Sequence, residues 1–276
     1  MRELSLRELQ LFTLDILKDV HTFCINNQLH YSVAFGTLIG AIRHRGFIPW
    51  DDDIDIVMPR PDYERFCQTY HSERFHLKHR GNDKNCMITF ARVYDNQKTM
   101  AKDVIPWCKE STGIWIDVFP IDGAPISQQE QQQQFDKAKK LWNKVIKVRK
   151  TKAAHLSRKI SVLHNYRLLN RKMRFLNGHI LNHLLDKQES IMRKVPYGTT
   201  PFCMHLSVLD ANHPEVVKTD SMNRYVLKPF EDTEVMVMED YDEILRITYG
   251  DYMQLPPEED RVGHSTQGQI KYFWKD

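Results

Sequence analysis

The sequence has few cysteines and no long apolar run, and both absences narrow the class of protein. Five cysteines stand among 276 residues, none of them in a Cys-x-x-Cys pair, so neither a disulfide framework nor a zinc ribbon is indicated. No apolar stretch approaches the ~20 residues that cross a bilayer, and the charged N-terminus is unlike a secretory signal peptide. We therefore expect a cytoplasmic globular protein with reduced thiols.

The net charge is small, but basic residues are concentrated in one segment. The whole chain carries +3. Between Lys137 and Arg174 there are nine Lys, five Arg and no acidic residue, so this segment carries +14 and the remainder carries −11. Such a distribution favours a polyanionic partner, for example nucleic acid, an anionic membrane surface or a phosphate-rich polymer.

The hydrophobic pattern predicts a protein of mixed helices and strands. Ser5 and Glu8 form a capping-box pattern before a long first helix. Apolar and β-branched runs predict short strands at 30–35, 54–58, 75–79, 87–94, 113–119 and 236–239. Residues 241–250 should form a short helix, and the pattern from 127 to about 195 is helical. We expect a single domain over 1–276 that contains a basic helical insertion, or subdomain, at 127–195.

Four aspartates in the run Asp51-Asp52-Asp53-Ile54-Asp55 are the most informative feature. Side chains two residues apart share a face of a strand, so Asp53 and Asp55 should project together while Ile54 points into the core. A divalent cation such as Mg²⁺ or Mn²⁺ would relieve their mutual repulsion. Asp51 has the same parity and can join them, whereas Asp52 should point elsewhere. The alternative is an acidic turn that caps a helix.

The pair Gly36-Thr37 precedes Asp53 by sixteen residues and should lie between a strand and a helix. Glycine lets backbone N–H groups approach a phosphate closely, and a helix N-terminus favours negative charge. Alone, such a pair more often marks a turn and an N-cap. Together with the Asp-x-Asp strand, it forms the Gly-[Ser/Thr]…Asp-x-Asp arrangement of nucleotidyltransferase folds.

A third carboxylate, Asp117, is expected beside this pair from a neighbouring strand. In the predicted strand at 113–119 it shares a face with Trp115 and Phe119. A charged residue between two aromatic residues is costly unless it is paired or bound to metal. The alternative is a buried structural aspartate that accepts hydrogen bonds from backbone donors.

Three motifs carry a family resemblance: FGTLIGAIRHRGFIPWDDDIDIVMPRPDYERF, WIDVFPIDG and YGDYMQLPPEEDR. They make the chain similar to the LicD family of bacterial phosphocholine transferases, which is related more distantly to fukutin-type ribitol-phosphate transferases. The match runs from about Phe35 to His264. The resemblance implies an α/β (α+β) fold of the nucleotidyltransferase type, in which helices flank a mixed sheet.

The same resemblance implies a catalytic site and a reaction. Metal binding falls on Asp53, Asp55 and Asp117, and two ions are expected. The donor would be CDP-choline or another CDP-alcohol, and the acceptor a glycan of the teichoic acid or lipopolysaccharide type, with CMP released. If the acceptor is lipid-linked, the basic segment could contact anionic lipid peripherally at the inner face of the membrane.

Two other functions are compatible with parts of this pattern. One is an enzyme of the same fold that adds NMP to RNA or to a small molecule. No RNA-binding module is recognisable, so a nucleic-acid partner is not expected. The other is a binding protein without catalysis, but the intact trio of carboxylates argues against it, because their repulsion would then be unrelieved.

Basic residues near the motifs are candidate phosphate ligands. Arginine suits planar, bidentate contacts to phosphate. Together with Gly36 and Thr37, the candidates for substrate binding are Arg43, His44, Arg92, Arg261 and His264. Taken one at a time, each is explained as well by a surface position or an ion pair.

Overall fold

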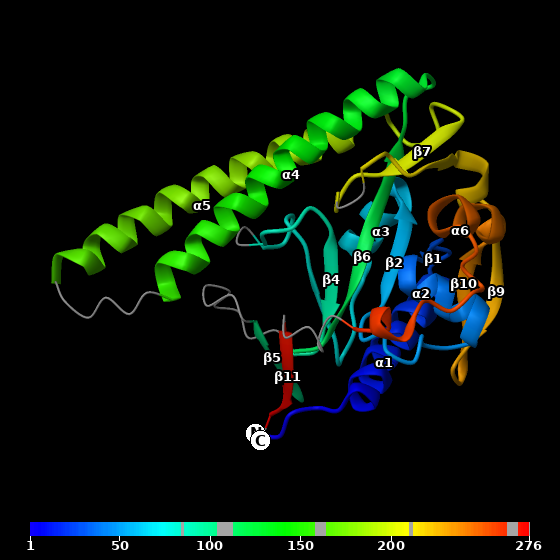
Figure 1. Ribbon diagram of the computed structural model, residues 1–276, viewed down its shortest axis with the longest axis horizontal. Helices are drawn as coiled ribbons and strands as arrows, with labels where there is room; N and C mark the ends of the chain where they lie inside the picture. The colour runs from blue at the N-terminus through cyan, green and yellow to red at the C-terminus, as the bar shows by residue number, and fades with distance from the viewer. Residues whose placement is uncertain (84–85, 104–112, 158–163, 210–211, 264–269, 276) are drawn as a thin grey trace.

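The computed structural model describes residues 1–83, 86–103, 113–157, 164–209, 212–263 and 270–275 (Figure 1). Its centre is a mixed sheet in the order β1-β2-β6-β4-β3, to which β7 and β8 are added beyond β6. The strands are β1 (Ser32–Val33), β2 (Asp55–Pro59), β3 (His76–Lys78), β4 (Ala91–Tyr94), β6 (Trp115–Gly123), β7 (Phe202–His205) and β8 (Val216–Lys218). Strands β2 and β6 are parallel, and the other neighbours are antiparallel. The predicted class, a mixed sheet flanked by helices, is confirmed.

Helix α1 (Leu6–Asn26) covers one face of this sheet and begins with the predicted capping box. The Ser5 hydroxyl accepts a hydrogen bond from the Glu8 N–H, and the Glu8 carboxylate accepts one from the Ser5 N–H. The apolar side of α1 packs into the main core, with Ile16 and Leu17 fully buried. Each buried aliphatic side chain of this size stabilises the fold by ~1.5–3 kcal/mol, so this face holds α1 against the sheet.

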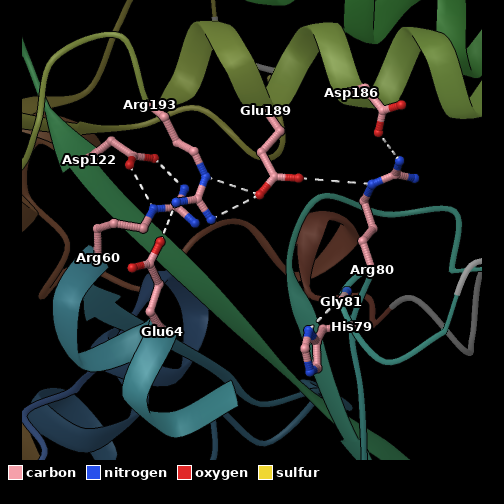
Figure 2. Close-up of polar contacts among 9 residues, drawn as sticks. All are labelled: Arg60, Glu64, His79, Arg80, Gly81, Asp122, Asp186, Glu189 and Arg193. Carbon is pink, nitrogen blue, oxygen red and sulfur yellow. Dashed lines mark hydrogen bonds and ion pairs between the residues drawn. The ribbon is translucent and has the colours of Figure 1, made fainter. Parts of the chain in front are cut away.

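Helix α3 (Arg60–Thr69) follows β2 directly and is fastened to β6 by a buried ion pair. The Arg60 guanidinium donates to both carboxylate oxygens of Asp122, at 2.7 Å from Nε and 2.5 Å from Nη2 (Figure 2). Only 8% of the Arg60 side chain and 2% of the Asp122 side chain are exposed. The bidentate geometry satisfies both buried charges.

Helices α4 (Gln128–Ser157) and α5 (His164–Met192) lie side by side and extend away from the sheet (Figure 1). They account for the helical pattern predicted for 127–195. Trp142 and Val145 of α4 are buried, and Val145 packs against Leu181 and Leu185 of α5. The apolar side of the basic segment, where its side chains are described, therefore faces the protein. Side chains at 149–174, most of that segment, lie outside the described residues.

The end of α5 is tied to α3 and to the loop after β3 by ion pairs (Figure 2). Arg193 pairs with Glu64 of α3 and with Glu189 of α5, the latter at 3.0 Å. Arg80 pairs with Asp186 and lies 3.9 Å from Glu189. Partly exposed pairs such as these contribute ~0–1 kcal/mol each, so they orient α5 more than they stabilise it.

The C-terminal region adds elements that the sequence predicted only in part. They are β9 (Tyr225–Phe230), β10 (Thr233–Met238) and α6 (Tyr241–Tyr249). The predicted strand at 236–239 and helix at 241–250 correspond to β10 and α6. Unpredicted strands β5 (Thr99–Asp103) and β11 (Ile270–Trp274) pair with each other. A bridge between Glu3 and Phe273 places the two chain ends together (Figure 1).

Within the described residues, no helix is long and apolar enough to cross a bilayer.

Candidate active site

Three charged residues lie in one line across the centre of the sheet. Asp55 of β2 is the register partner of Asp117 on the parallel strand β6. On the other side of β6, Arg92 of β4 lies opposite Asp117, and its Nε donates to Asp117 Oδ1 at 2.6 Å. Paired residues on neighbouring strands project from the same face. The face that carries this line is the candidate active site.

Negative charge at this face exceeds what the protein itself neutralises. Burial raises the pKa of Asp55 well above its usual range, and the charges of Asp53, Asp117 and Asp51 raise it further. The Arg92 guanidinium offsets part of this effect. The predicted approach of carboxylates from β2 and β6 is therefore present, together with the repulsion that a bound cation would relieve.

The acidic run Asp51-Asp52-Asp53 precedes β2, and its three carboxylates lie closer together than the sequence suggested. Asp51, Asp52 and Asp53 each offer one carboxylate oxygen, and these atoms lie within 4.8 Å of one another. The prediction that Asp52 points elsewhere is wrong. Strand β2 begins at Asp55, so the alternation of a strand does not govern residues 51–53. Burial and the charge of Asp52 raise the pKa of Asp51 to about 6.

Gly36 and Thr37 lie in the first turn of α2 (Phe35–Ile39), which continues into the π-helical turn η1 (Gly40–His44). The strand expected at 30–35 is shorter, because β1 ends at Val33. The Thr37 hydroxyl accepts a hydrogen bond of 3.0 Å from the Asp55 N–H. Gly36 lies against the Asp51 carboxylate. Both residues thus position the acidic run, while their predicted contact with phosphate stays a prediction.

His44 and Arg261 contact Trp50, the residue before the acidic run, and Arg43 lies close to both of them. The Arg261 guanidinium lies over the Trp50 ring at 5.5 Å, and the His44 ring meets it edge-on at 6.5 Å. Arg43 donates to the carbonyl oxygen of Tyr252 at 2.6 Å. Burial and then the charge of Arg261 lower the pKa of Arg43, so the two guanidinium groups are near each other. Positive charge from two distant segments therefore meets near Trp50, the residue that precedes the acidic run.

The other two basic candidates are Arg92 and His264. The guanidinium of Arg92 forms an ion pair with Asp117, so this arginine holds the carboxylate. His264 lies outside the described residues. For both, a contact with phosphate stays a prediction.

Tyr272 of β11 is a site residue that sequence reasoning missed. Burial raises the pKa of its phenol, the charge of Arg92 opposes this, and Asp52, Asp117 and Asp53 raise it further. The hydroxyl is therefore close to the charged line and to the acidic run. No local signal identifies it, because its position depends on the pairing of β11 with β5.

The donor set fits a hard divalent cation. It consists of carboxylate oxygens, the ligands that Mg²⁺ and Mn²⁺ prefer. Burial, and after it the charges of neighbouring aspartates, raise the pKa values of Asp51 and Asp55, and a cation bound here would oppose both effects. Asp51, Asp52 and Asp53 could hold a metal ion as they stand, and Asp55 and Asp117 lie beside them.

The chain is similar to several known proteins. The family model described as LicD/FKTN/FKRP, nucleotidyltransferase domain, matches residues 28–146. The lipopolysaccharide cholinephosphotransferase LicD of Haemophilus influenzae is 32% identical over 274 residues, which cover 97% of this chain and 98% of that protein. Two uncharacterized proteins match short stretches: one of Rickettsia typhi is 43% identical over 53 residues (19% of this chain and 17% of that protein), and one of Rickettsia prowazekii is 45% identical over 47 residues (17% and 18%). The similarity to the Haemophilus protein thus includes the helical region as well as the sheet.

Proposed function

The chain belongs to the LicD family and is an enzyme of the LicD type, and from this premise we propose that it transfers phosphocholine or a related alcohol phosphate. The donor is CDP-choline or another CDP-alcohol, the acceptor is a sugar hydroxyl of a cell-surface glycan precursor, and CMP is released. One observation carries the proposal: Asp55 and Asp117 face the same side of adjacent strands, beside a compact acidic run. The likeness to a lipopolysaccharide cholinephosphotransferase supports lipopolysaccharide as the acceptor, with teichoic acid as the other candidate.

Asp53, Asp55 and Asp117 would hold two divalent cations, Mg²⁺ or Mn²⁺, with Asp51 beside them. When bound, such cations neutralise the donor's diphosphate and lower the pKa of the acceptor hydroxyl. The pKa of Asp55 is raised by burial and then by the charges of Asp53, Asp117 and Asp51, and this crowding of carboxylates supports the assignment.

The chain's own residues position the reacting groups. In our proposal Arg43 and Arg261 orient the diphosphate, since the Arg261 guanidinium lies over the ring of Trp50, the residue before Asp51, and Arg43 is close to Arg261. Arg92 holds Asp117 in place, and Asp117 accepts the proton of the acceptor hydroxyl as the new P–O bond forms and the bond to CMP breaks. Positioning and electrostatics supply most of the rate in reactions of this kind.

In our proposal the basic segment helps to present the acceptor. Lys140, Lys144 and Lys147 of α4 are exposed, while the apolar side of the same stretch packs inside the protein. We propose a peripheral contact with anionic membrane that is electrostatic, with ~1 kcal/mol of attraction for each nearby Lys or Arg. Such binding to anionic vesicles should be lost at high salt, and equal binding to neutral vesicles would exclude it.

The decisive experiment combines the full chain, Mg²⁺, a panel of CDP-alcohols, and lipopolysaccharide or teichoic acid. We expect CMP release in equal amount to the alcohol phosphate found on the acceptor, and none with EDTA. Attachment of CMP itself to an acceptor would instead support a nucleotidyl transfer. No turnover with any CDP-alcohol would refute the proposal.

A further inference from the structure

A cavity of about 380 Å³ opens on the sheet face that carries the catalytic carboxylates. Val57 lines it and stands two residues after Asp55 on β2. Ile121 lines it too and stands four residues after Asp117 on β6. Because side chains two apart share a face, the cavity continues the catalytic face along the same two strands. A group joined to a phosphate at the aspartates could reach it.

Most of the cavity wall is apolar or aromatic. Leu38, Leu245 and Met238 line it with Val57 and Ile121. The polar side chains of Gln128, Gln131, Gln132 and Thr248 lie elsewhere in the lining. Against the apolar walls, the hydroxyl groups of a polyol would lack hydrogen-bond partners, which is costly. A group with methyl surfaces and no N–H or O–H to satisfy suits these walls much better.

Two side chains give one end of the cavity a preference for positive charge. Glu215 and Tyr249 both line it. Among the described residues, the Glu215 carboxylate accepts no hydrogen bond and forms no ion pair; burial raises its pKa, and the nearby His213, which also lines the cavity, opposes this rise. Burial and then the charges of Glu215, Asp55 and Asp51 raise the pKa of Tyr249. The phenol is therefore close both to Glu215 and to Asp55 and Asp51. Of the surface of Tyr249, 44% remains exposed and can contact a ligand.

His205 and Phe35 complete an aromatic lining without adding positive charge. Burial lowers the pKa of His205 to about 4, so its ring is neutral near pH 7. Its Nε2 is buried and has no hydrogen-bond partner. The Phe35 ring lies 5.5 Å from it, and the backbone of Phe35 has φ of 49°, a left-handed conformation that is uncommon outside glycine. Such an unfavourable conformation is found mainly where the surrounding structure holds a residue in place for function.

We propose that this cavity selects the donor's alcohol by binding its trimethylammonium group. This inference rests on the proposed function. Glu215 supplies the counter-charge, and the rings of Tyr249 and Phe35 contact the methyl groups. A quaternary ammonium ion is attracted to aromatic faces and needs no hydrogen bond. The enzyme would therefore prefer choline to an uncharged alcohol such as glycerol or ribitol.

Calorimetric binding to the full chain tests this assignment, with CDP-choline, CDP-glycerol and phosphocholine as separate probes. Glu215→Gln should weaken CDP-choline and phosphocholine about tenfold and leave CDP-glycerol unchanged, because only the first two carry the ammonium charge. Tyr249→Leu should act in the same way, while Tyr249→Phe keeps the ring and the affinity. Glu243→Gln is the matched control, since this exposed acid lies on α6 with Tyr249, does not line the cavity and pairs with Lys218 at 3.8 Å.

The outcomes separate this inference from the proposed function. Equal weakening of CDP-choline and CDP-glycerol by Glu215→Gln, or no weakening of either, would overturn the cavity assignment even if the enzyme transfers phosphocholine. Conversely, phosphocholine binding that depends on Glu215, in a protein that transfers phosphocholine to no acceptor, would keep the cavity assignment and reject the proposed transfer. Melting temperatures of all variants show that each remains folded.

Discussion

A Cβ atom on Gly36 would lie 2.6 Å from Oδ2 of Asp51. Gly36 belongs to the first turn of α2, and Asp51 lies in the acidic run before β2. The missing side chain therefore allows the acidic run to approach α2 closely, and the contact sets where the Asp51 carboxylate lies.

Replacing Gly36 by alanine should damage the site more than the fold. The added methyl displaces the Asp51 carboxylate, which is the mobile end of a side chain, so we expect ~1 kcal/mol of destabilisation at most. The Mg²⁺ concentration for half-maximal activity should rise about tenfold, which corresponds to 1.4 kcal/mol. Gly178→Ala is the control, because a Cβ there meets nothing within 4 Å. An unchanged Mg²⁺ requirement in Gly36→Ala would separate Asp51 from the metal site.

Asp53→Asn and Asp55→Asn should abolish turnover and leave the metal-free protein folded. Each substitution removes a proposed metal ligand and also relieves the repulsion that raises the pKa of Asp55. The melting temperature in EDTA should therefore hold or rise. The exposed acid Asp232, paired with Lys18, provides the control Asp232→Asn. A variant with wild-type activity at limiting Mg²⁺ would remove that residue from the proposed site.

Asp117→Asn should lower kcat by orders of magnitude and also destabilise the protein. The substitution leaves the half-buried guanidinium of Arg92 without its ion-pair partner, and such a loss is costly. The double variant Arg92→Met/Asp117→Asn removes both charges and should recover much of the stability without recovering activity. Recovery of activity together with stability would show that Asp117 has only a structural role.

The buried pair Arg60–Asp122 should be the strongest single ion pair for stability among those described here. Asp122→Asn leaves a guanidinium that is 8% exposed without its charge partner, and we expect a loss of roughly 3–5 kcal/mol in the free energy of unfolding. Glu3→Gln breaks the exposed pair with Lys271 and should cost less than about 1 kcal/mol. Urea unfolding of both variants measures the difference. Equal effects would contradict the assigned role of burial.

Stability should fall on acidification because of His205. In the unfolded chain histidine titrates near 6.5, but burial lowers the folded pKa to about 4. Between these values the unfolded state binds more protons, so the stability present above pH 6.5 is lost as the pH falls toward 4. The loss is on the order of 3 kcal/mol. His205→Phe should abolish this part of the pH dependence in urea unfolding with EDTA present. An identical pH profile in the variant would contradict the prediction.

Local features of the chain were predictable from the sequence alone. The capping box at Ser5 and Glu8, the helices over 127–195 and the strand after the acidic run depend on neighbours a few residues apart. The Asp-x-Asp run and Asp117 were also identified from their residue types and spacing. These features, and the motifs that carry the family resemblance, require no knowledge of which strands pair.

The arrangement of the site could not be predicted in this way. The Asp55–Asp117 register depends on the parallel pairing of β2 and β6. Asp52 was misplaced because strand alternation was applied to residues that precede the strand. Tyr272 reaches the site only through the pairing of β11 with β5. In each case the free energy of packing between distant segments decides the position.

The sequence thus determined the family, the mixed α/β class and the carboxylates, because these follow from motifs and from local periodicity. Tertiary structure alone decided how the carboxylates and arginines meet. It also decided that an apolar cavity, lined by Glu215 and Tyr249, lies next to the carboxylates. The cavity walls include residues of α2, β2, β6, α4, β7, β10 and α6 and of the segment before β8. No sequence pattern joins segments so far apart, since their contact arises only when the chain buries a shared core.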